Sequence, residues 1–260
     1  MTSGEAHLEV LPSADWAAAV AARLVARLAA HRNLRICLPT GETPAPLYTA
    51  IVAAEHRGDV SFAEATLVML DEWLGLPPGD PARGDEMLRR ELIGRLRVPP
   101  ARFVAIDVDG PDPAAAAARH DREAAGLDLA ILGLGINGHV GFNEPGSGPQ
   151  DTTRVVEVAA TTGEIASTRY GASVTPHAGI TIGLARLLEA REAWLLVTGE
   201  RKAEMLYRAL HRPESRDCPA SYLRRHARLT VFADEAAAEM LPDAGARRSP
   251  GPSIPTHPVI

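Results

Sequence analysis

The alternation of short apolar runs with amphipathic helical segments constrains the fold of this chain more than any other feature. Residues 128–133 (DLAILG) are a clear case, because this apolar run directly follows an alanine-rich helical segment at 112–125. Such alternation is typical of βαβ units, in which parallel strands lie between layers of helices. It predicts an α/β fold, namely a single-domain, Rossmann-like, doubly wound and mostly parallel sheet flanked by helices.

The individual elements are predicted from apolar spacing and turn residues. Strands are expected at residues 34–38, 66–70, 102–106, 128–133, 154–159, 193–198 and 228–232. Helices are expected at residues 14–31, 44–55 with Thr43 as the N-cap, 85–97, 112–125, 179–190, 200–211 and 234–241. A chain of 260 residues suits one domain of this kind. We place that domain at residues 1–241 and a Pro/Gly-rich C-terminal tail at 242–260.

Charge and composition narrow the functional classes. The net charge of −6 disfavours a nucleic-acid partner, and the basic cluster at residues 224–228 is expected to be a solvated face. No apolar run approaches the roughly 18 residues of a membrane span. The N-terminus lacks a secretory pattern, so a cytoplasmic location is expected. Cys37 and Cys218 stand in unrelated contexts and are expected to be reduced thiols.

Ligands of an open α/β sheet bind at the carboxyl ends of its strands, and four unusual patches fall there. The first patch is residues 38–44 (LPTGETP), in which a strand ends, a glycine follows and a helix begins. Helix N-terminal N–H groups and a threonine hydroxyl would suit a phosphate group. The alternative interpretation is an ordinary turn with a capped helix.

The second patch is an acidic pair, Asp71 and Glu72, directly after the apolar run 66–70. A carboxylate at that place would face the ligand crevice. Partial burial would raise its pKa, so it could act as a base on a carbon acid. The alternatives are a solvated loop carboxylate and a helix cap.

The third patch is the glycine-rich segment 132–147, which holds His139 and Glu144 five residues apart. A histidine there can move protons near neutral pH, and the glutamate can orient it. The spacing of Gly135 and Gly138 is compatible with a dinucleotide motif, but His139 and Pro145 interrupt the helix that such a motif requires. We therefore reject a dinucleotide site.

The fourth patch contains Lys202, expected in the first turn of the helix 200–211. The helix dipole disfavours a cation there, so the lysine indicates an anionic ligand nearby. A surface lysine on a charged helix is the alternative interpretation.

Together the patches resemble the glucosamine-6-phosphate deaminase/6-phosphogluconolactonase superfamily over residues 8–240. LPTGETP resembles its phosphate loop, MLDEWLGL its catalytic-aspartate segment, and ITIGLARLLEAREAWLLVTGERKAEML its C-terminal helix–strand–helix. LGLGINGHVGFNEPGS is similar to the deaminase signature. The lactonase branch continues its Gly-His with a Ser-Leu-Phe-Pro type sequence, whereas this chain has residues 142–145 as FNEP, which favours the deaminase branch.

The resemblance implies catalytic residues at Asp71, Asn137, His139 and Glu144, and substrate- or phosphate-binding residues at Thr40, Gly41, Glu42, Thr43, Arg169 and Lys202. Asp71 would move a proton between C2 and C1 of the sugar, and His139 with Glu144 would assist ring opening. Two positions depart from the family pattern. Asn137 replaces an aspartate, so the relay must depend on Glu144. Glu42 replaces a small residue, and unless it turns away it would repel a dianion.

The implied reaction is the isomerisation and deamination of glucosamine 6-phosphate to fructose 6-phosphate and ammonia, without a metal or organic cofactor. The segment 81–87 (PARGDEM) lacks a Ser-Tyr type pattern of hexosamine deaminases, so galactosamine 6-phosphate stays open as the substrate. A 6-phosphogluconolactonase-like hydrolase and a non-catalytic sugar-phosphate sensor are further alternatives. The expected partner is a small sugar phosphate rather than a nucleic acid or a membrane. A homo-oligomer is compatible with the sequence.

Overall fold

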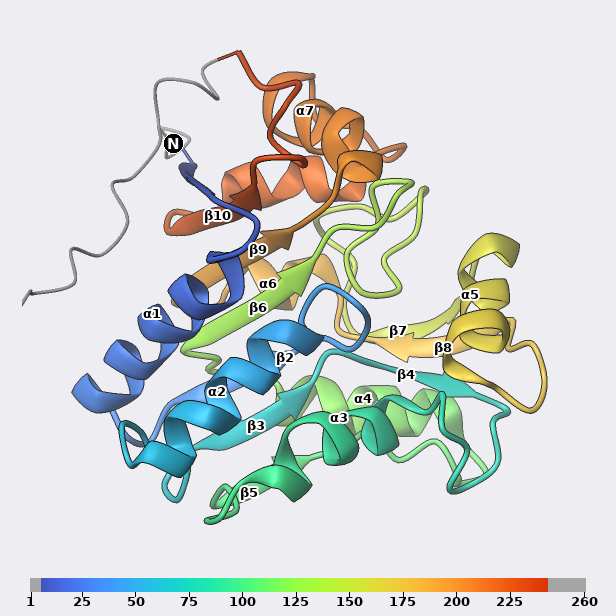
Figure 1. Ribbon diagram of the computed structural model, residues 1–260. Helices are drawn as coiled ribbons and strands as arrows, with labels where there is room; N and C mark the ends of the chain where they lie inside the picture. The colour runs from blue at the N-terminus through green and yellow to red at the C-terminus, as the bar shows by residue number, and fades with distance from the viewer. Residues whose placement is uncertain (1–5, 243–260) are drawn as a thin grey trace, which may run out of the picture.

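A seven-stranded parallel sheet forms the centre of the computed structural model, which describes residues 6–242 (Figure 1). Its strands are β1 (His7–Leu11), β2 (Arg35–Leu38), β3 (Thr66–Met69), β5 (Arg102–Val104), β6 (Leu129–Gly133), β9 (Glu192–Val197) and β10 (Leu229–Asp234). They are arranged in the order β1-β10-β9-β6-β2-β3-β5, and each neighbouring pair is parallel. This confirms the predicted α/β fold.

Helices cover both faces of this sheet. The helices of residues 6–242 are α1 (Trp16–Ala30), α2 (Ala45–Arg57), α3 (Gly84–Glu91), α4 (Pro113–Glu123), α5 (Ala160–Tyr170), α6 (Leu184–Leu188) and α7 (Ala203–His211), with 3-10 turns η1 (Ile93–Arg95), η2 (Glu200–Lys202) and η3 (Pro219–Arg225). Successive strand residues point to opposite faces. Ile36 and Leu38 therefore pack in the core beneath α1 and α2, whereas Cys37 packs in the core beneath α6, α7 and η3.

A second, three-stranded antiparallel sheet joins the first one at Leu70. It comprises β4 (Asp71–Leu74), β8 (Ala178–Thr181) and β7 (Arg154–Glu157), in the order β4-β8-β7. The Leu70 N–H donates to the Leu38 carbonyl in the large sheet at 3.1 Å, and the Leu70 carbonyl accepts from the Ile182 N–H beside β8 at 2.9 Å. Asp71 is thus fixed at the junction of the two sheets.

The strand order reverses between β2 and β6, which lie side by side. From β2 the chain continues to β3 and β5 on one side, and from β6 it continues to β9 and β10 on the other. Loops that leave two such neighbours diverge, and the crevice between them is the usual ligand site of an open α/β sheet. The loops after β2 and β6 are the first and third of the predicted patches.

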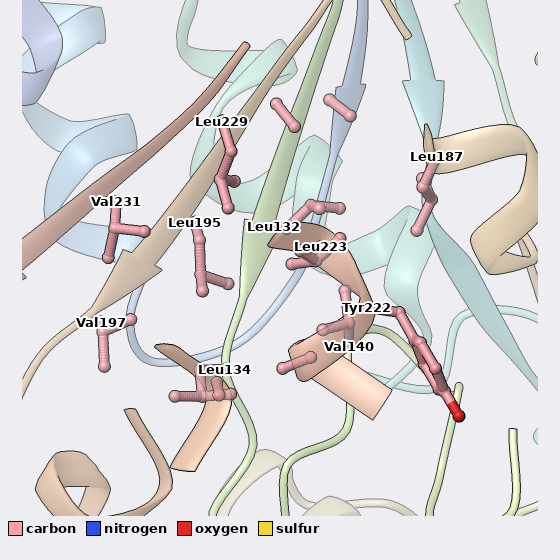
Figure 2. Packing of buried hydrophobic residues seen from close by; sticks show 14 of the residues in the cluster. Leu132, Leu134, Val140, Leu187, Leu195, Val197, Tyr222, Leu223, Leu229 and Val231 are labelled. Carbon is pink, nitrogen blue, oxygen red and sulfur yellow. The ribbon is translucent and has the colours of Figure 1, made fainter. Parts of the chain in front are cut away.

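The glycine-rich loop after β6 is anchored in the core at both ends. Leu134 and Val140 are buried in the same cluster as Tyr222 and Leu223 of η3, and Figure 2 shows Val140 next to Tyr222. Burial of such a side chain stabilises the fold by about 1.5–3 kcal/mol. His139, between these anchors, is therefore held by a well-packed support.

Several predicted elements are wrong in detail. The expected helix 179–190 is instead β8, the central strand of the small sheet, followed by the short α6. Strands β1 and β4 and helix α5 were not predicted, and the expected helix 85–97 ends as α3 at Glu91, before η1. Residues 235–240 form turns where a helix was expected. The strands that were predicted, and helices α1, α2, α4 and α7, agree with prediction to within a few residues.

The remaining expectations have mixed outcomes. Cys37 and Cys218 are free, as predicted, and the structure shows that both are buried. The basic cluster 224–228 is not wholly solvated, because His226 is buried with Nε2 2.8 Å from the Ala190 carbonyl. None of the helices in residues 6–242 is long and apolar enough to cross a membrane. Of the expected tail, all but Pro242 lies outside the described residues.

Candidate active site

A pocket of about 190 Å3, open to solvent, lies at the carboxyl ends of β2, β3, β6 and β9. Four segments line it: the loop after β2, the β3–β4 junction, the loop after β6 and the turn after β9. Helix α5 adds Thr161, Thr162, Ile165, Arg169 and Tyr170. The structure thus brings the four predicted patches together. Every predicted site residue lines the pocket except Glu144, which lies behind Asn137 and His139.

Asp71 is the buried carboxylate of the pocket, with 7% of its surface exposed. Gly141 leaves it room, since a Cβ at that position would lie 2.9 Å from Oδ2 of Asp71. Burial raises the pKa of Asp71 to about 7, and the nearby charge of Glu72 adds to the rise. A carboxyl group with this pKa can both accept and return a proton near neutral pH.

Glu72, the second residue of the acidic pair, has a different environment. It is fully buried and accepts hydrogen bonds from the backbone N–H groups of Trp73, Gly84 and Asp85, each at 2.8 Å. Two of these donors begin α3. The sequence shows two adjacent carboxylates, whereas the structure turns one into the pocket and uses the other to fix a helix N-terminus.

His139 and Glu144 form the centre of a small polar network. Nδ1 of His139 lies 3.4 Å from Oε2 of Glu144, within ion-pair range, but finds no partner placed for a hydrogen bond in residues 6–242. Oε2 of Glu144 also accepts from Asn137 Nδ2 at 2.7 Å, and Oε1 accepts from the Thr162 hydroxyl at 2.8 Å. Burial would raise the pKa of Glu144, but its contacts with His139, Thr162 and Asn137 outweigh burial and hold the pKa below its ordinary value.

Gly135 gives the His139 ring its place, because a Cβ on Gly135 would overlap the imidazole atoms. The Gly135 N–H also donates to the His139 carbonyl at 2.9 Å, which closes the loop. Asp71, His139 and Glu144 together are called the proton-transfer end of the pocket below.

A second group of pocket residues, from the loop after β2, the turn after β9 and α5, carries the cations. Nζ of Lys202 donates to the Thr43 hydroxyl at 2.7 Å and so connects the turn after β9 to the loop after β2. Thr43 therefore serves this contact and does not cap α2, whose N-cap is Pro44. Lys202 ends η2 and directly precedes α7, instead of lying inside its first turn.

Lys202 is held in an environment that makes its charge costly. Burial lowers its pKa to about 8, while the charges of Glu42 and Asp234 oppose the fall. The turn before it is fixed by Asp234 at the end of β10, whose carboxylate accepts the Gly199 N–H at 3.0 Å.

Arg169 and Glu42 complete this side of the pocket. Arg169, in the last turn of α5, pairs with Glu42 through an Nη1–Oε1 contact. Both side chains keep substantial exposure, 36% for Arg169 and 62% for Glu42. Glu42, Thr43, Arg169 and Lys202 are called the anion end of the pocket below.

Sequence reasoning missed one part of the site and used only part of the signal at Lys202. Thr162 and Tyr170 belong to α5, whose sequence ATTGEIASTRY has too weak an apolar pattern to predict a helix. The sequence singles out Lys202 more strongly by composition than by its place near a helix N-terminus, because it is the only lysine in the chain. Where a chain otherwise uses arginine, one lysine at a strand end indicates a compact ammonium with a specific task.

The sequence of this chain matches those of known proteins over most of its length. Residues 12–232 match the family described as Glucosamine-6-phosphate isomerases/6-phosphogluconolactonase. The chain belongs to this family. A glucosamine-6-phosphate deaminase of Corynebacterium aurimucosum is 37% identical over 229 residues, which cover 86% of this chain and 90% of the relative. Glucosamine-6-phosphate deaminase 2 of Bacillus subtilis is 33% identical over 230 residues, 86% of this chain and 92% of the relative.

Solved structures of the glucosamine-6-phosphate isomerase/6-phosphogluconolactonase family share the same fold. A monomeric glucosamine-6-phosphate deaminase superposes with a TM-score of 0.84 at 27% identity, covering 90% of this chain and 99% of its own. A 6-phosphogluconolactonase from Thermotoga maritima gives a TM-score of 0.71 at 18% identity, covering 88% of this chain and 99% of its own. Both branches therefore keep the architecture, and the pocket residues must decide between their chemistries.

Proposed function

We propose that this protein is an amino-sugar-6-phosphate deaminase that converts glucosamine 6-phosphate and water to fructose 6-phosphate and ammonia. The observation that carries the proposal is Asp71, a buried carboxyl group whose pKa of about 7 suits proton transfer at neutral pH. It shares one pocket with His139 and with the cationic groups of Lys202 and Arg169. Relatives named as deaminases at 33–37% identity over most of the chain support the same choice.

In the proposed reaction, His139 assists ring opening, which exposes an aldehyde at C1 of the sugar. Asp71 then removes the proton from C2 and delivers it to C1, so that a C2 imine replaces the C2 amine. Water adds to the imine carbon, and the resulting carbinolamine loses ammonia to leave a ketone. Each step needs a proton carrier near neutral pH and no other reactant beyond water.

The anion end supplies the binding energy in this proposal. The ammonium of Lys202, the hydroxyl of Thr43, the backbone at Thr40 and Gly41, and the guanidinium of Arg169 would hold the 6-phosphate. Binding energy from a group remote from the reacting carbons positions C1 and C2 against Asp71. A phosphorylated sugar is then used far better than the same sugar without its phosphate.

A coupled assay tests the proposal. Ammonia release would be measured with glucosamine 6-phosphate, galactosamine 6-phosphate and unphosphorylated glucosamine, in parallel with lactone opening on 6-phosphogluconolactone. Ammonia release confined to an amino-sugar phosphate supports the proposal, and the comparison of the two hexosamine phosphates identifies the substrate. Lactone opening without ammonia release contradicts it.

The cellular setting follows from the substrate. A sugar phosphate is a dianion that does not cross a membrane unaided, so we place the enzyme with its substrate in the cytoplasm. A solved structure that is 27% identical to this chain is named as a monomeric glucosamine-6-phosphate deaminase, so one chain of this fold can form a working site. The proposed activity therefore does not require a second copy of the chain. Cell fractionation and size-exclusion chromatography with an activity readout test both points.

A further inference from the structure

The anion end contains the carboxylate of Glu42, whose negative charge would weaken the binding of a phosphate group. Glu42 lies between Gly41 and Thr43 in the loop after β2, and its side chain pairs with Arg169 of α5. The two residues are 127 positions apart in the sequence. Glu42 is therefore paired with Arg169, the guanidinium that the proposed function assigns to the substrate's phosphate group.

The Tyr170 side chain, next to Arg169 in α5, also contacts the loop after β2. The Tyr170 hydroxyl lies against the loop, since a Cβ on Gly41 would come within 3.4 Å of it. Burial raises the pKa of Tyr170, and the charge of Glu42 adds to the rise. The C-terminal end of α5 is thus docked on the loop after β2, with Arg169 directed to Glu42.

A guanidinium binds carboxylate and phosphate oxygens through the same planar set of N–H donors. A bound dianion between Arg169 and Lys202 would lie close to the Glu42 charge, which repels it. Glu42 is exposed enough to turn into solvent, because 62% of its side chain is accessible. Arg169 can therefore release the Glu42 carboxylate and bind a phosphate group without a change in the fold.

We propose that Glu42 is an internal ligand of Arg169 that the substrate's phosphate group must displace. This inference rests on the proposed function and adds a specificity device to it. A dianion displaces the carboxylate because it gains both Lys202 and Arg169. A ligand with a single negative charge, such as a sugar carboxylate, gains less and competes poorly. Glu42 thus lowers affinity for all anions and raises the preference for dianions over monoanions.

The test uses inorganic phosphate and the only lysine. Lysine labelled with 13C at the ε carbon gives one side-chain NMR signal, from Lys202, which reports phosphate binding without any turnover. The variants are Glu42→Gln and, as a matched control, Glu64→Gln. Glu64 is a similarly exposed glutamate, 58% accessible, that pairs with Arg32 at 3.9 Å and does not line the pocket.

We expect Glu42→Gln to bind phosphate about three- to tenfold more tightly, the scale of a modest ion pair and its repulsion of a dianion. KM for the amino-sugar phosphate should fall by the same factor, while kcat changes less than about twofold. Glu64→Gln should match the wild type. In an Arg169→Ala background, Glu42→Gln should tighten phosphate binding much less, because there is no longer an Arg169 guanidinium for Glu42 to release.

Other outcomes overturn the inference. Equal or weaker phosphate binding in Glu42→Gln would mean that the carboxylate does not compete. A full gain in the Arg169→Ala background would mean that Glu42 acts by repulsion alone. Absence of any phosphate response at Lys202 in every variant, wild type included, would overturn the proposed function itself. If the Lys202 signal responds to phosphate but Glu42→Gln does not tighten phosphate binding, only this inference is overturned.

Discussion

The proton-transfer end and the anion end of the pocket are built on opposite principles. At the proton-transfer end, Asp71 is buried at a junction of two sheets, and Glu144 is held by hydrogen bonds from Asn137 and Thr162. At the anion end, Glu42 and Arg169 form an exposed ion pair. The first end fixes proton affinity through burial and has little freedom. The second keeps charges that can exchange partners.

This difference suits what each end is proposed to do. A base that works near neutral pH needs a raised pKa, and removing water from a carboxylate is the direct means of raising it. A phosphate site must take up and release a dianion in every turnover, so partners that remain hydrated are an advantage. Substitutions should therefore separate chemistry from binding according to the end that they alter.

The largest expected effect is at Asp71. Asp71→Asn should lower kcat by at least about a hundredfold, because the general base is lost. Phosphate binding, measured by the Lys202 NMR signal, should stay within about twofold of the wild type. The ammonia assay measures kcat, and circular dichroism confirms the fold. Near-normal turnover in a folded variant would refute the assignment, and a comparable loss of phosphate binding would mean that the two ends are not independent.

The next largest effect is at Lys202. Lys202→Ala should raise KM about ten- to hundredfold, the range for one lost hydrogen bond from a charged group. kcat at saturation should change much less, because Asp71 and His139 are untouched. Steady-state kinetics with the phosphorylated substrate give both constants. Arg201→Ala, at the neighbouring pocket position, is the control for a change of charge. A fall in kcat with unchanged KM would contradict the separation of the two ends.

A smaller effect is expected at Thr162, the residue of α5 that contacts the proton-transfer end. Thr162→Val keeps the shape but removes the hydrogen bond to Glu144. The pKa of Glu144 should rise, and kcat should fall about three- to tenfold with little change in KM. Thr168→Val is the matched control, because its hydroxyl bonds only the Glu164 carbonyl within the same helix. Equal effects in both variants would reduce the role of Thr162 to helix stability.

The smallest effect concerns stability. The pKa of Asp71 is about 7 in the folded state and 3.8 in the reference state. Because the folded state holds this proton more tightly, stability falls as pH rises from about 4 to about 7. Asp71→Asn removes that loss, so its Tm relative to the wild type should be several degrees higher at pH 8 than at pH 5. Calorimetry measures this, with the exposed Asp59→Asn as control. A pH-independent difference would contradict the raised pKa.

Much of the fold could be predicted because its strands are continuous apolar runs, as in β6 and β9, where local sequence and final environment agree. Strand β8 could not be predicted, because the largely apolar segment from Ile180 to Leu188 fits a helix equally well. Its pairing with β4 and β7, which lie far away in the sequence, decides the outcome. Helix α5 was missed because its few apolar residues receive their support from the rest of the fold.

The candidate site could be predicted at the level of loops and not of contacts. The positions of Asp71, His139 and Lys202 after predicted strands indicated that they share one crevice, and all three line the same pocket in the structure. The contacts Thr43–Lys202 and Glu144–Thr162 span 159 and 18 residues, and no local pattern encodes them. The different environments of Asp71 and Glu72 depend on the switch between sheets at Leu70, which local sequence does not reveal.

The pairing of β1 with β10 has a consequence for how the protein is made. β1 lies at one edge of the sheet, and its partner β10 is the last strand of the chain, with His7 opposite Thr230. On the ribosome, β1 must wait for nearly the whole chain to be synthesised before it can pair. Asp234, at the end of β10, also fixes the turn that holds Lys202. The loop that holds His139 depends on the same late part of the chain, because the Ala220 N–H of η3 donates to the Gly138 carbonyl at 2.9 Å. Both ends of the pocket are thus completed only when the last strands have been synthesised, and catalysis becomes a property of the finished polypeptide.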